Sequence, residues 1–494
     1  MSHSTTPTYF PMHVGGEDRA SASGRTYLSL NPFTGEAWAE VPDGNAEDVD
    51  AAVAAARLAL QGEWGMLTPT RRGVLLRRLG ELIARDSAYL AELETRDNGK
   101  LLREMLGQMA SLPDWYAYFG GLADKLTGDV IATDKPNFHV YTRHEPVGVV
   151  AAITPWNSPL MLLTWKLAPA LAAGCTMVIK PSDHTPVSTI ALARLVDEAG
   201  FPPGVVNVVT GWGPETGKAL SSHPGVDRVA FTGSTEVGRL IAHAAADNLT
   251  RSSLELGGKS AQLVFADADL DAAANGIVGG VFAATGQTCM AGSRVLVHAD
   301  VAEELTAKVV DRARRIRLGD PMLAETEMGP VANQRQYDTV TQHFAWAVED
   351  GATVAYGGRA DPQLGGLFVQ PTVLTDATLQ MRSVSQEIFG PVVAITAFDD
   401  EDEAVAIANG TEFGLAGSVW TSDIRRAHRV AAALRCGTVW INAYRVVAPQ
   451  VPFGGVGLSG WGRENGAAAI ADYTETKAVW VELSGATRDP FVLG

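Results

Sequence analysis

From residue 148 onward, short apolar runs alternate with segments that have helical periodicity. A strand, a helix and a further strand at this spacing fold into a parallel sheet with crossover helices. The chain is therefore expected to be an α/β protein. The first series predicts strands over 148–153, 175–179, 205–209 and 228–231, and helices over 160–173, 187–199, 216–220 and 234–246.

A second series of the same kind starts near residue 261, so we expect a second α/β domain. Its strand candidates are 261–265, 294–298, 353–356, 392–398, 417–420 and 438–442. Its helix candidates are 272–284, 302–316, 334–350, 401–409 and 424–434. A length of 494 residues fits two or three domains of ordinary size.

The segments at the two ends of this α/β region have other patterns. Helical periodicity covers 46–60, 69–85 and 88–118, and a strand pattern covers 138–143. A last strand is expected over 477–483 with no obvious partner nearby. It could pair with another segment of the chain or with another subunit.

The composition excludes several classes of protein. The chain has 39 basic and 56 acidic residues and no Lys/Arg-rich run, which argues against nucleic-acid and membrane partners. There is no apolar run of about 18 residues and no signal-peptide pattern at the N-terminus. The three widely spaced cysteines form neither a disulfide framework nor a metal motif, so we expect no metal and a reducing, cytoplasmic location.

Cys289 and Glu255 are the strongest candidates for chemistry. An ionised thiol is a strong nucleophile, and a carboxylate can activate water. Together they could form and then hydrolyse a thioester. Gly286 and Gly292 beside the cysteine would let the backbone approach a substrate closely. A buried small hydrophobe and a surface carboxylate are the alternatives for the two residues taken singly.

Polar residues also follow three expected strands. Asn157 could donate its amide to an oxyanion, or it could merely hold a turn between two prolines. Lys180 and Asp183 lie where open α/β sheets bind ligands, and both could contact ribose hydroxyls. The string 231–238 joins a strand to a helix, where Gly233 allows a tight turn and Ser234 can cap a helix that binds phosphate.

Taken together, these strings resemble the aldehyde dehydrogenase superfamily, in its NAD(P)-dependent, non-acylating branch. The resemblance covers essentially the whole chain. The strings that carry it are 154–159, 180–182, 231–238, 255–259, 286–289, 387–392 and 452–455.

The resemblance implies a Rossmann-like cofactor domain from residues 1–129 and 149–255. It also implies an α/β catalytic domain from 256–465. A small β oligomerisation element would come from 130–148 and 466–494, which would give the strand near 477 a partner. The assembly would be a homodimer or a homotetramer.

The resemblance also implies a mechanism. Cys289 attacks the aldehyde, Asn157 and the Cys289 backbone N–H hold the oxyanion, and Glu255 activates water to hydrolyse the thioester. Lys180 and Glu387 match positions that contact the cofactor riboses. Phe389 matches a position that packs near the nicotinamide, and Glu464 matches a position linked to proton relay. The cysteine needs surroundings that favour its thiolate. The full cofactor set is Ile153, Thr154, Pro155, Trp156, Lys180, Ser182, Asp183, Gly213, Gly217, Phe231, Thr232, Gly233, Ser234, Val237, Leu256, Gly257, Glu387 and Phe389.

Two features depart from the family or vary within it. Asp183 stands where the family usually has Glu and is one methylene shorter; NAD is still expected, with NADP as the alternative. Arg445 could bind the carboxylate of a semialdehyde, or it could form a salt bridge at the surface or at a subunit interface. By resemblance, the substrate tunnel is lined by Ser158, Leu162, Trp165, Thr288, Met290, Arg445, Val447 and Phe453.

Three other functions remain open at this point. One is an acylating dehydrogenase that passes the acyl group to coenzyme A. A water-activating Glu255 argues against it, because it would hydrolyse the thioester before the transfer. Another is a cysteine esterase or thioesterase without redox chemistry. The third is a non-catalytic protein on the same fold, which the set of Cys289, Glu255 and Asn157 makes unattractive.

Overall fold

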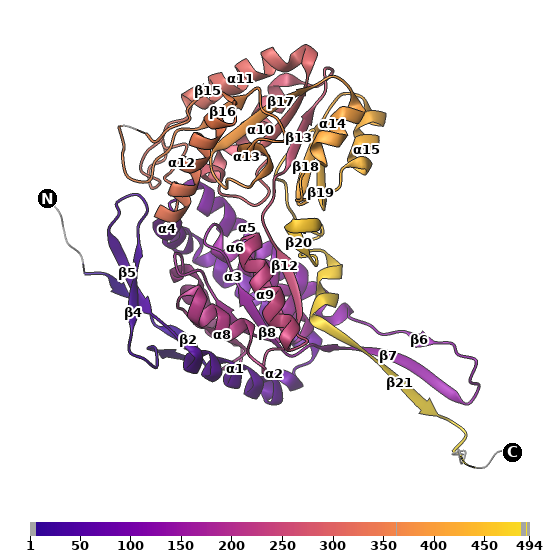
Figure 1. Cartoon of the computed structure of the whole chain (residues 1–494). Helices are drawn as coiled ribbons and strands as arrows, with labels where there is room; N and C mark the ends of the chain where they lie inside the picture. Colours follow the sequence, from indigo (N-terminus) through magenta and orange to yellow (C-terminus); the bar gives the residue numbers. More distant parts are fainter. Residues whose placement is uncertain (1–5, 362, 486–490, 492–494) are drawn as a thin grey trace.

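The computed structural model describes residues 6–361, 363–485 and 491. It has two α/β lobes stacked on each other and a β arm that projects from the lower lobe (Figure 1). The lower lobe is built on an eight-stranded sheet of order β20-β12-β11-β8-β9-β10-β2-β3, and the upper lobe on a seven-stranded sheet of order β15-β16-β17-β14-β13-β18-β19. The α/β expectation is therefore confirmed for both halves of the chain.

The first sheet is parallel through its centre and antiparallel at both ends. Strands β8, β9 and β11 are buried along their whole length, because helices cover both faces of the sheet. Its strands are β2 (Met12–Val14), β3 (Glu17–Arg19), β8 (Val149–Ile153), β9 (Thr176–Lys180), β10 (Val206–Val208), β11 (Arg228–Thr232), β12 (Arg251–Glu255) and β20 (Gly460–Trp461).

Helices of the lower lobe close the expected βαβ units. They are α6 (Pro159–Ala173), α7 (Val187–Ala199), α8 (Lys218–Ser221) and α9 (Thr235–Asp247). The N-terminal helices pack beside them: α1 (Ala46–Gln61), α2 (Glu63–Met66), α3 (Pro69–Arg85), α4 (Ser87–Asn98) and α5 (Leu102–Leu122).

The prediction of one continuous helix over 88–118 is wrong, because the segment forms two helices, α4 and α5. Gly99 ends α4 with a φ of 74°, a left-handed conformation that glycine adopts without strain. A Cβ atom there would also lie 2.9 Å from Pro330. The apolar periodicity continues through this break, which is why the pattern alone did not reveal it.

The second sheet is parallel except for its edge strand β15. Its strands are β13 (Ala261–Val264), β14 (Arg294–His298), β15 (Thr353–Tyr356), β16 (Thr372–Thr375), β17 (Val392–Phe398), β18 (Ala416–Trp420) and β19 (Thr438–Ile441). Its helices are α10 (Leu270–Val281), α11 (Ala302–Arg315), α12 (Gln334–Glu349), α13 (Arg382–Ser385), α14 (Glu401–Ala408) and α15 (Ile424–Ala433).

Several strands were missing from the sequence-based expectation. The N-terminal region forms β1 (Thr8–Tyr9), β4 (Thr26–Leu30) and β5 (Ala37–Pro42) in a small sheet of their own. Strands β12, β16 and β20 were missed as well. They are short, and β12 reads Arg-Ser-Ser-Leu-Glu, so their pairing depends on neighbours distant in sequence rather than on an apolar run.

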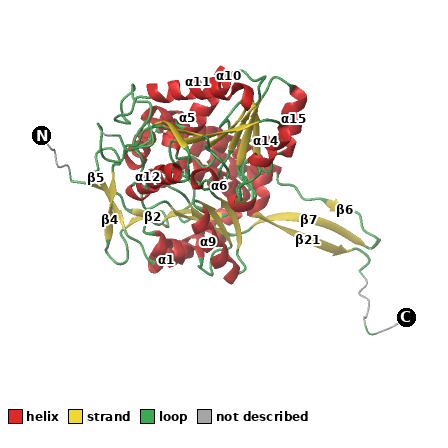
Figure 2. Cartoon of the chain, turned by 45° about the horizontal axis from the view of Figure 1, so that its top comes forward, coloured by secondary structure: helices red, strands yellow, loops and turns green. Residues whose placement is uncertain are grey.

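The projecting arm is formed by β6 (Val130–Ile131), β7 (Phe138–Pro146) and β21 (Thr474–Glu482) (Figures 1 and 2). Strand β21 pairs antiparallel with β7 along nine residues, with Lys477 opposite Arg143. The C-terminal strand thus has the partner that the family resemblance implied. Within the described residues, no helix is long and apolar enough to cross a bilayer.

Candidate active site

Cys289 lies in a loop after α10 that is held in place by two close backbone contacts. A Cβ atom on Gly286 would come within 2.1 Å of the Gly390 carbonyl oxygen, and one on Gly258 within 2.7 Å of the Cys289 carbonyl oxygen. Gly286 packs on the Gly390 backbone and Gly292 on the Gln262 side chain, so packing requires both glycines. Their expected role in letting the backbone approach a substrate stays a prediction.

The Cys289 thiol is partly buried. Burial, followed by the negative charges of Glu255 and Glu387, raises its pKa to about 12. The Met290 backbone N–H and Arg445 act in the opposite direction. A raised pKa means that the thiol needs a base or a change of charge to ionise.

Asn157 is brought to the cysteine loop, as expected for an oxyanion donor. It is buried in the loop before α6, and its Nδ2 donates a hydrogen bond of 2.9 Å to the Gln287 carbonyl oxygen. The amide group is thereby fixed two residues away from the thiol along the chain. An NH₂ group has two donors, so one remains for a substrate oxygen.

Glu255 ends β12 and enters the site from the lower lobe. It lies opposite Thr232 of β11 and is 4% exposed, and neither of its carboxylate oxygens has a hydrogen-bond partner among the described residues. Burial, and then the charge of Glu464, raise its pKa well above the usual range. A carboxylate this isolated holds a proton readily and is a strong base once it has lost that proton.

Lys166 connects Glu464 to the parallel sheet and was missed by the sequence analysis. Its Nζ, fully buried on α6, donates to Glu464 and, at 2.6 Å, to Thr232 Oγ1. Burial raises the pKa of Glu464, and the charge of Lys166 lowers it. A lone lysine in the otherwise apolar run 160–173 was the signal available, since a buried lysine needs a partner.

The carboxyl ends of the central strands form one edge lined by predicted cofactor residues. Ile153, at the end of β8, lies opposite Lys180 of β9, and Thr154 Oγ1 is buried without a partner among the described residues. Lys180 Nζ donates to the Pro181 carbonyl oxygen at 2.7 Å, and burial lowers its pKa to about 8. The residues that follow these strands are Pro155, Trp156, Ser182, Asp183, Leu256 and Gly257, while Gly213 and Gly217 bound a single helical turn.

The turn into α9 has the geometry expected of an anion-binding helix start. Ser234 caps the helix by accepting the Val237 backbone N–H at 3.3 Å. Gly233 is required by packing, because a Cβ atom there would lie 2.5 Å from the Phe231 ring. The helix N-terminus and its dipole therefore face the strand-end edge with backbone donors available.

Residues of the 387–392 string reach this edge from the upper lobe. The Gly258 N–H donates to Glu387 Oε1 at 3.0 Å, and burial raises the pKa of Glu387 to about 7. Phe389, whose φ is 54°, meets Trp156 edge to face with ring centroids 5.2 Å apart. Groups predicted separately for the cofactor are thus in contact across the two lobes.

An aromatic wall lies on the other side of the cysteine loop. The Trp165 ring is 5.2 Å from that of Phe453, and Phe453 exchanges two backbone hydrogen bonds of 2.7 Å with Glu464. Val447 and Met161 line an open groove on this side of the molecule. Leu162 is buried on α6 beside these groups, and Met290 accepts a hydrogen bond from Tyr444 through its carbonyl oxygen.

Arg445 lies directly beside the cysteine loop. Its guanidinium donates to the carbonyl oxygens of Gly279 and Ala283 and, at 3.3 Å, to Thr288 Oγ1. Within the described residues it has no carboxylate at ion-pair distance. A substrate carboxylate and a salt bridge at a subunit interface both stay predictions for this residue.

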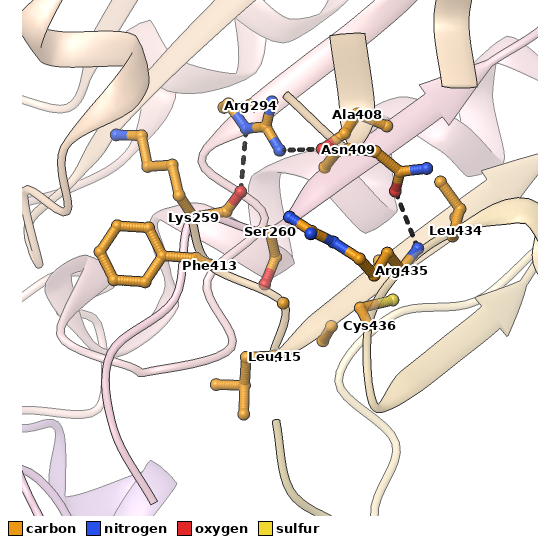
Figure 3. A pocket seen from close by; sticks show the side chains of 14 residues that line it. Lys259, Ser260, Arg294, Ala408, Asn409, Phe413, Leu415, Leu434, Arg435 and Cys436 are labelled. Atoms are coloured by element: carbon orange, nitrogen blue, oxygen red, sulfur yellow. Dashed lines mark hydrogen bonds between the residues drawn. The ribbon is translucent and has the colours of Figure 1, made fainter. Parts of the chain in front are cut away.

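A small enclosed pocket elsewhere in the upper lobe is a packing feature (Figure 3). Arg294 donates to the Lys259 carbonyl oxygen at 2.9 Å and to the carbonyl oxygens of Ile407 and Ala408, which closes the end of α14 (Figure 3). Burial lowers the pKa of Lys259 to about 7. None of the predicted site residues lines this pocket, and its cations are engaged with backbone oxygens.

Comparisons with known proteins agree with this geometry. Residues 19–479 match the aldehyde dehydrogenase family. A (Z)-2-((N-methylformamido)methylene)-5-hydroxybutyrolactone dehydrogenase of Acinetobacter baylyi is 45% identical over 98% of this chain and 99% of its own. Retinaldehyde dehydrogenase 3 of Mus musculus is 47% identical over 95% and 92%. A betaine aldehyde dehydrogenase of Staphylococcus aureus, crystallised with NAD+, superposes with a TM-score of 0.96 at 40% identity over 98% and 99% of the two chains.

Proposed function

Because this chain belongs to the aldehyde dehydrogenase family, we propose that Cys289, Asn157 and Glu255 carry out its oxidation of an aldehyde to a carboxylic acid. One observation carries the assignment. The amide of Asn157 is fixed on the cysteine loop, and the isolated carboxyl of Glu255 raises the pKa of the same thiol. Nucleophile, oxyanion donor and base thus meet at one place.

The strand-end edge of the lower lobe suits a dinucleotide, and NAD is the proposed cofactor. Thr154 Oγ1 is a buried polar atom without a partner among the described residues, and the start of α9 offers backbone donors to a phosphate. Lys180 and Glu387 would hold the riboses, and Phe389 with Trp156 would flank the nicotinamide. Asp183 disfavours a 2′-phosphate by charge repulsion. When bound, NAD accepts the hydride that leaves the aldehyde carbon.

The chain's own groups supply the remaining steps. The thiol proton passes to Glu255, the sulfur bonds to the carbonyl carbon, and Glu255 gives up that proton before the hydrolytic step begins. The oxygen, now negative, accepts hydrogen bonds from Asn157 Nδ2 and the Cys289 backbone N–H. After the hydride has left, water attacks the thioester while Glu255 takes its proton, and the thiolate departs. Glu464 and Lys166 form the route by which that proton leaves Glu255.

The other assignments follow the same reasoning. Residues 1–129 and 149–255 form the proposed cofactor domain, although β20 joins its sheet from within 256–465, the proposed catalytic domain. The arm from 130–148 and 466–494 is the proposed surface for a homodimer or homotetramer, and residues 486–490 and 492–494 lie outside the described part.

Three free cysteines support a cytoplasmic location. A coenzyme A acceptor is not favoured, because Glu255 directs water to the thioester.

The proposed substrate is an aldehyde with an apolar body and a polar tail. Trp165 and Phe453 supply an apolar wall, while Arg445 adds a cation beside Thr288. A panel of aliphatic, aromatic and carboxylated aldehydes, with NAD or NADP and with or without coenzyme A, tests the whole proposal. We expect NADH and the free acid; acyl-coenzyme A as the product would contradict it.

A further inference from the structure

Four polar side chains lie next to Asn157 in the chain or in contact with the residues around the cysteine loop, and they take no part in the chemistry proposed above. Lys100, just before α5, is 2% exposed, and its Nζ donates to Ser158 Oγ at 2.7 Å. Gln108 of α5 approaches the same hydroxyl with its Nε2 at 3.5 Å. Glu104, one turn earlier on α5, accepts the Ala284 backbone N–H at 3.0 Å next to the cysteine loop.

Lys100 is a buried cation without an ion partner in the described part of the chain. Its nearest recorded contact is a neutral hydroxyl, and no carboxylate lies at ion-pair distance. Glu94 and Glu104 act on it only from further away. A buried charge is costly unless it is paired, so the site is incomplete around Lys100. Burial lowers its pKa to about 8, as expected for such a group.

Charges of both signs surround the cysteine loop. Lys100 and Arg445 each interact electrostatically with Cys289 and repel one another, and Glu104 is the carboxylate with the largest effect on both. Lys100 is buried without an ion pair among the described residues, and a ligand with a single negative charge would compensate its charge. An ammonium tail would be repelled, and a hydroxyl tail would leave the lysine charge uncompensated.

We propose that Lys100 is a specificity-determining residue that binds a carboxylate on the tail of the aldehyde, with Arg445 as the second cation and Ser158 and Gln108 as supporting donors. This inference rests on the proposed function, since the tail is placed only if the aldehyde carbon meets Cys289. The substrate class is then an ω-oxo acid.

The test compares matched aldehydes in the full-length enzyme with NAD. The pairs are 4-oxobutanoate with butanal and 5-oxopentanoate with pentanal, and kcat/KM is measured for wild type, Lys100→Met, Lys100→Arg and Gln108→Leu. Lys125→Met is the matched control, because Lys125 is 67% exposed and pairs with Asp124. Thermal unfolding and NAD binding are recorded for every variant to detect misfolding.

We expect wild type to prefer at least one oxo acid over its neutral partner by ten-fold or more. Lys100→Met should lose at least ten-fold more kcat/KM on that oxo acid than on the neutral aldehyde, mainly through KM, and Lys100→Arg should recover part of the loss. Equal losses on both members, or no preference in wild type, would overturn the inference while leaving the proposed function intact. Absence of NADH with every aldehyde would overturn both.

If the Lys100 variants do not fold, an inhibition measurement on the wild-type enzyme takes the place of the kinetic comparison. Succinate and glutarate should then inhibit competitively against the aldehyde, more strongly than the corresponding diamides by ten-fold or more. Dicarboxylates that inhibit no better than the diamides would also overturn the role of Lys100, because the diamides have nearly the same length and shape but carry no charge.

Discussion

Gly286 and Gly390 are in backbone contact, so that a Cβ atom on Gly286 would meet the Gly390 carbonyl oxygen at 2.1 Å. Gly286 belongs to the string that contains the nucleophile, and Gly390 to the string that contains Glu387 and Phe389. The contact therefore fixes the cysteine loop relative to the cofactor residues of the upper lobe. It also accounts for the glycine at this position.

Gly286→Ala should displace the cysteine loop. The φ of 69° costs an alanine about 1 kcal/mol, and the contact with Gly390 costs more. We expect a lowered melting temperature and at least a ten-fold lower kcat. Gly107→Ala is the matched control, since Gly107 lies in α5 with open space around it, and that change should stabilise the protein by about 0.5–1 kcal/mol. Equal effects in the two variants would rule out the packing role.

Cys289→Ala should abolish NADH formation and leave NAD binding within about two-fold, because the cofactor edge belongs to other elements. Stopped-flow absorbance and cofactor titration measure the two properties. Cys436→Ala is the control, since Cys436 is the other partly exposed thiol and lines the pocket of Figure 3. Residual aldehyde oxidation in Cys289→Ala would remove the residue from the nucleophile role.

Glu255→Gln should slow the burst of NADH, because Glu255 takes the thiol proton, and its steady-state turnover should fall by about 10²–10⁴-fold, the usual contribution of a general base. The wild-type rate should rise with pH, because burial raises the pKa of Glu255 and only the deprotonated carboxylate can accept a proton. Rapid-quench and pH–rate measurements test both points. Full turnover in the variant would exclude Glu255 as the base.

Changes at Glu464 and Lys166 should move the pH–rate profile in opposite directions. Glu464→Gln removes a negative charge that raises the pKa of Glu255, so its profile should shift to lower pH. Lys166→Met removes a positive charge that lowers it, so its profile should shift to higher pH.

Lys166→Met should also destabilise the protein by about 3–5 kcal/mol, because it breaks a buried ion pair. Chemical denaturation measures this loss and the pH–rate profile measures the shifts. Shifts in the same direction for the Glu464 and Lys166 variants would refute the electrostatic coupling to Glu255.

Trp480→Glu should weaken self-association. Trp480 is 54% exposed on the arm, next to Phe138, with Val130 and Ile131 exposed on β6. A charge placed in this apolar surface is costly to bury in an interface. Analytical ultracentrifugation should show a smaller species than wild type. Leu58→Glu, on the exposed face of α1 away from the arm, should leave the mass unchanged; an unchanged mass for Trp480→Glu would exclude the arm as the interface.

The sequence by itself determined the features that depend on local pattern. Alternating apolar runs predicted both parallel sheets, and helix α7 has the predicted bounds, Val187–Ala199. The strings around Cys289, Glu255 and Asn157 were sufficient to identify the family, and they predict that the three residues act in one site. Hydrophobic periodicity and motif spacing are local properties of the sequence, so they can be recognised before the fold is known.

Only the tertiary structure decided which polar groups meet. Lys166 and Glu464 are 298 residues apart in the chain and form one buried pair, and Lys100 reaches Ser158 from the link between α4 and α5. The raised pKa of Cys289 was likewise invisible in the sequence, since burial and two carboxylates cause it. Desolvation and charge coupling depend on what surrounds a group in space, and that environment exists only after the chain has folded.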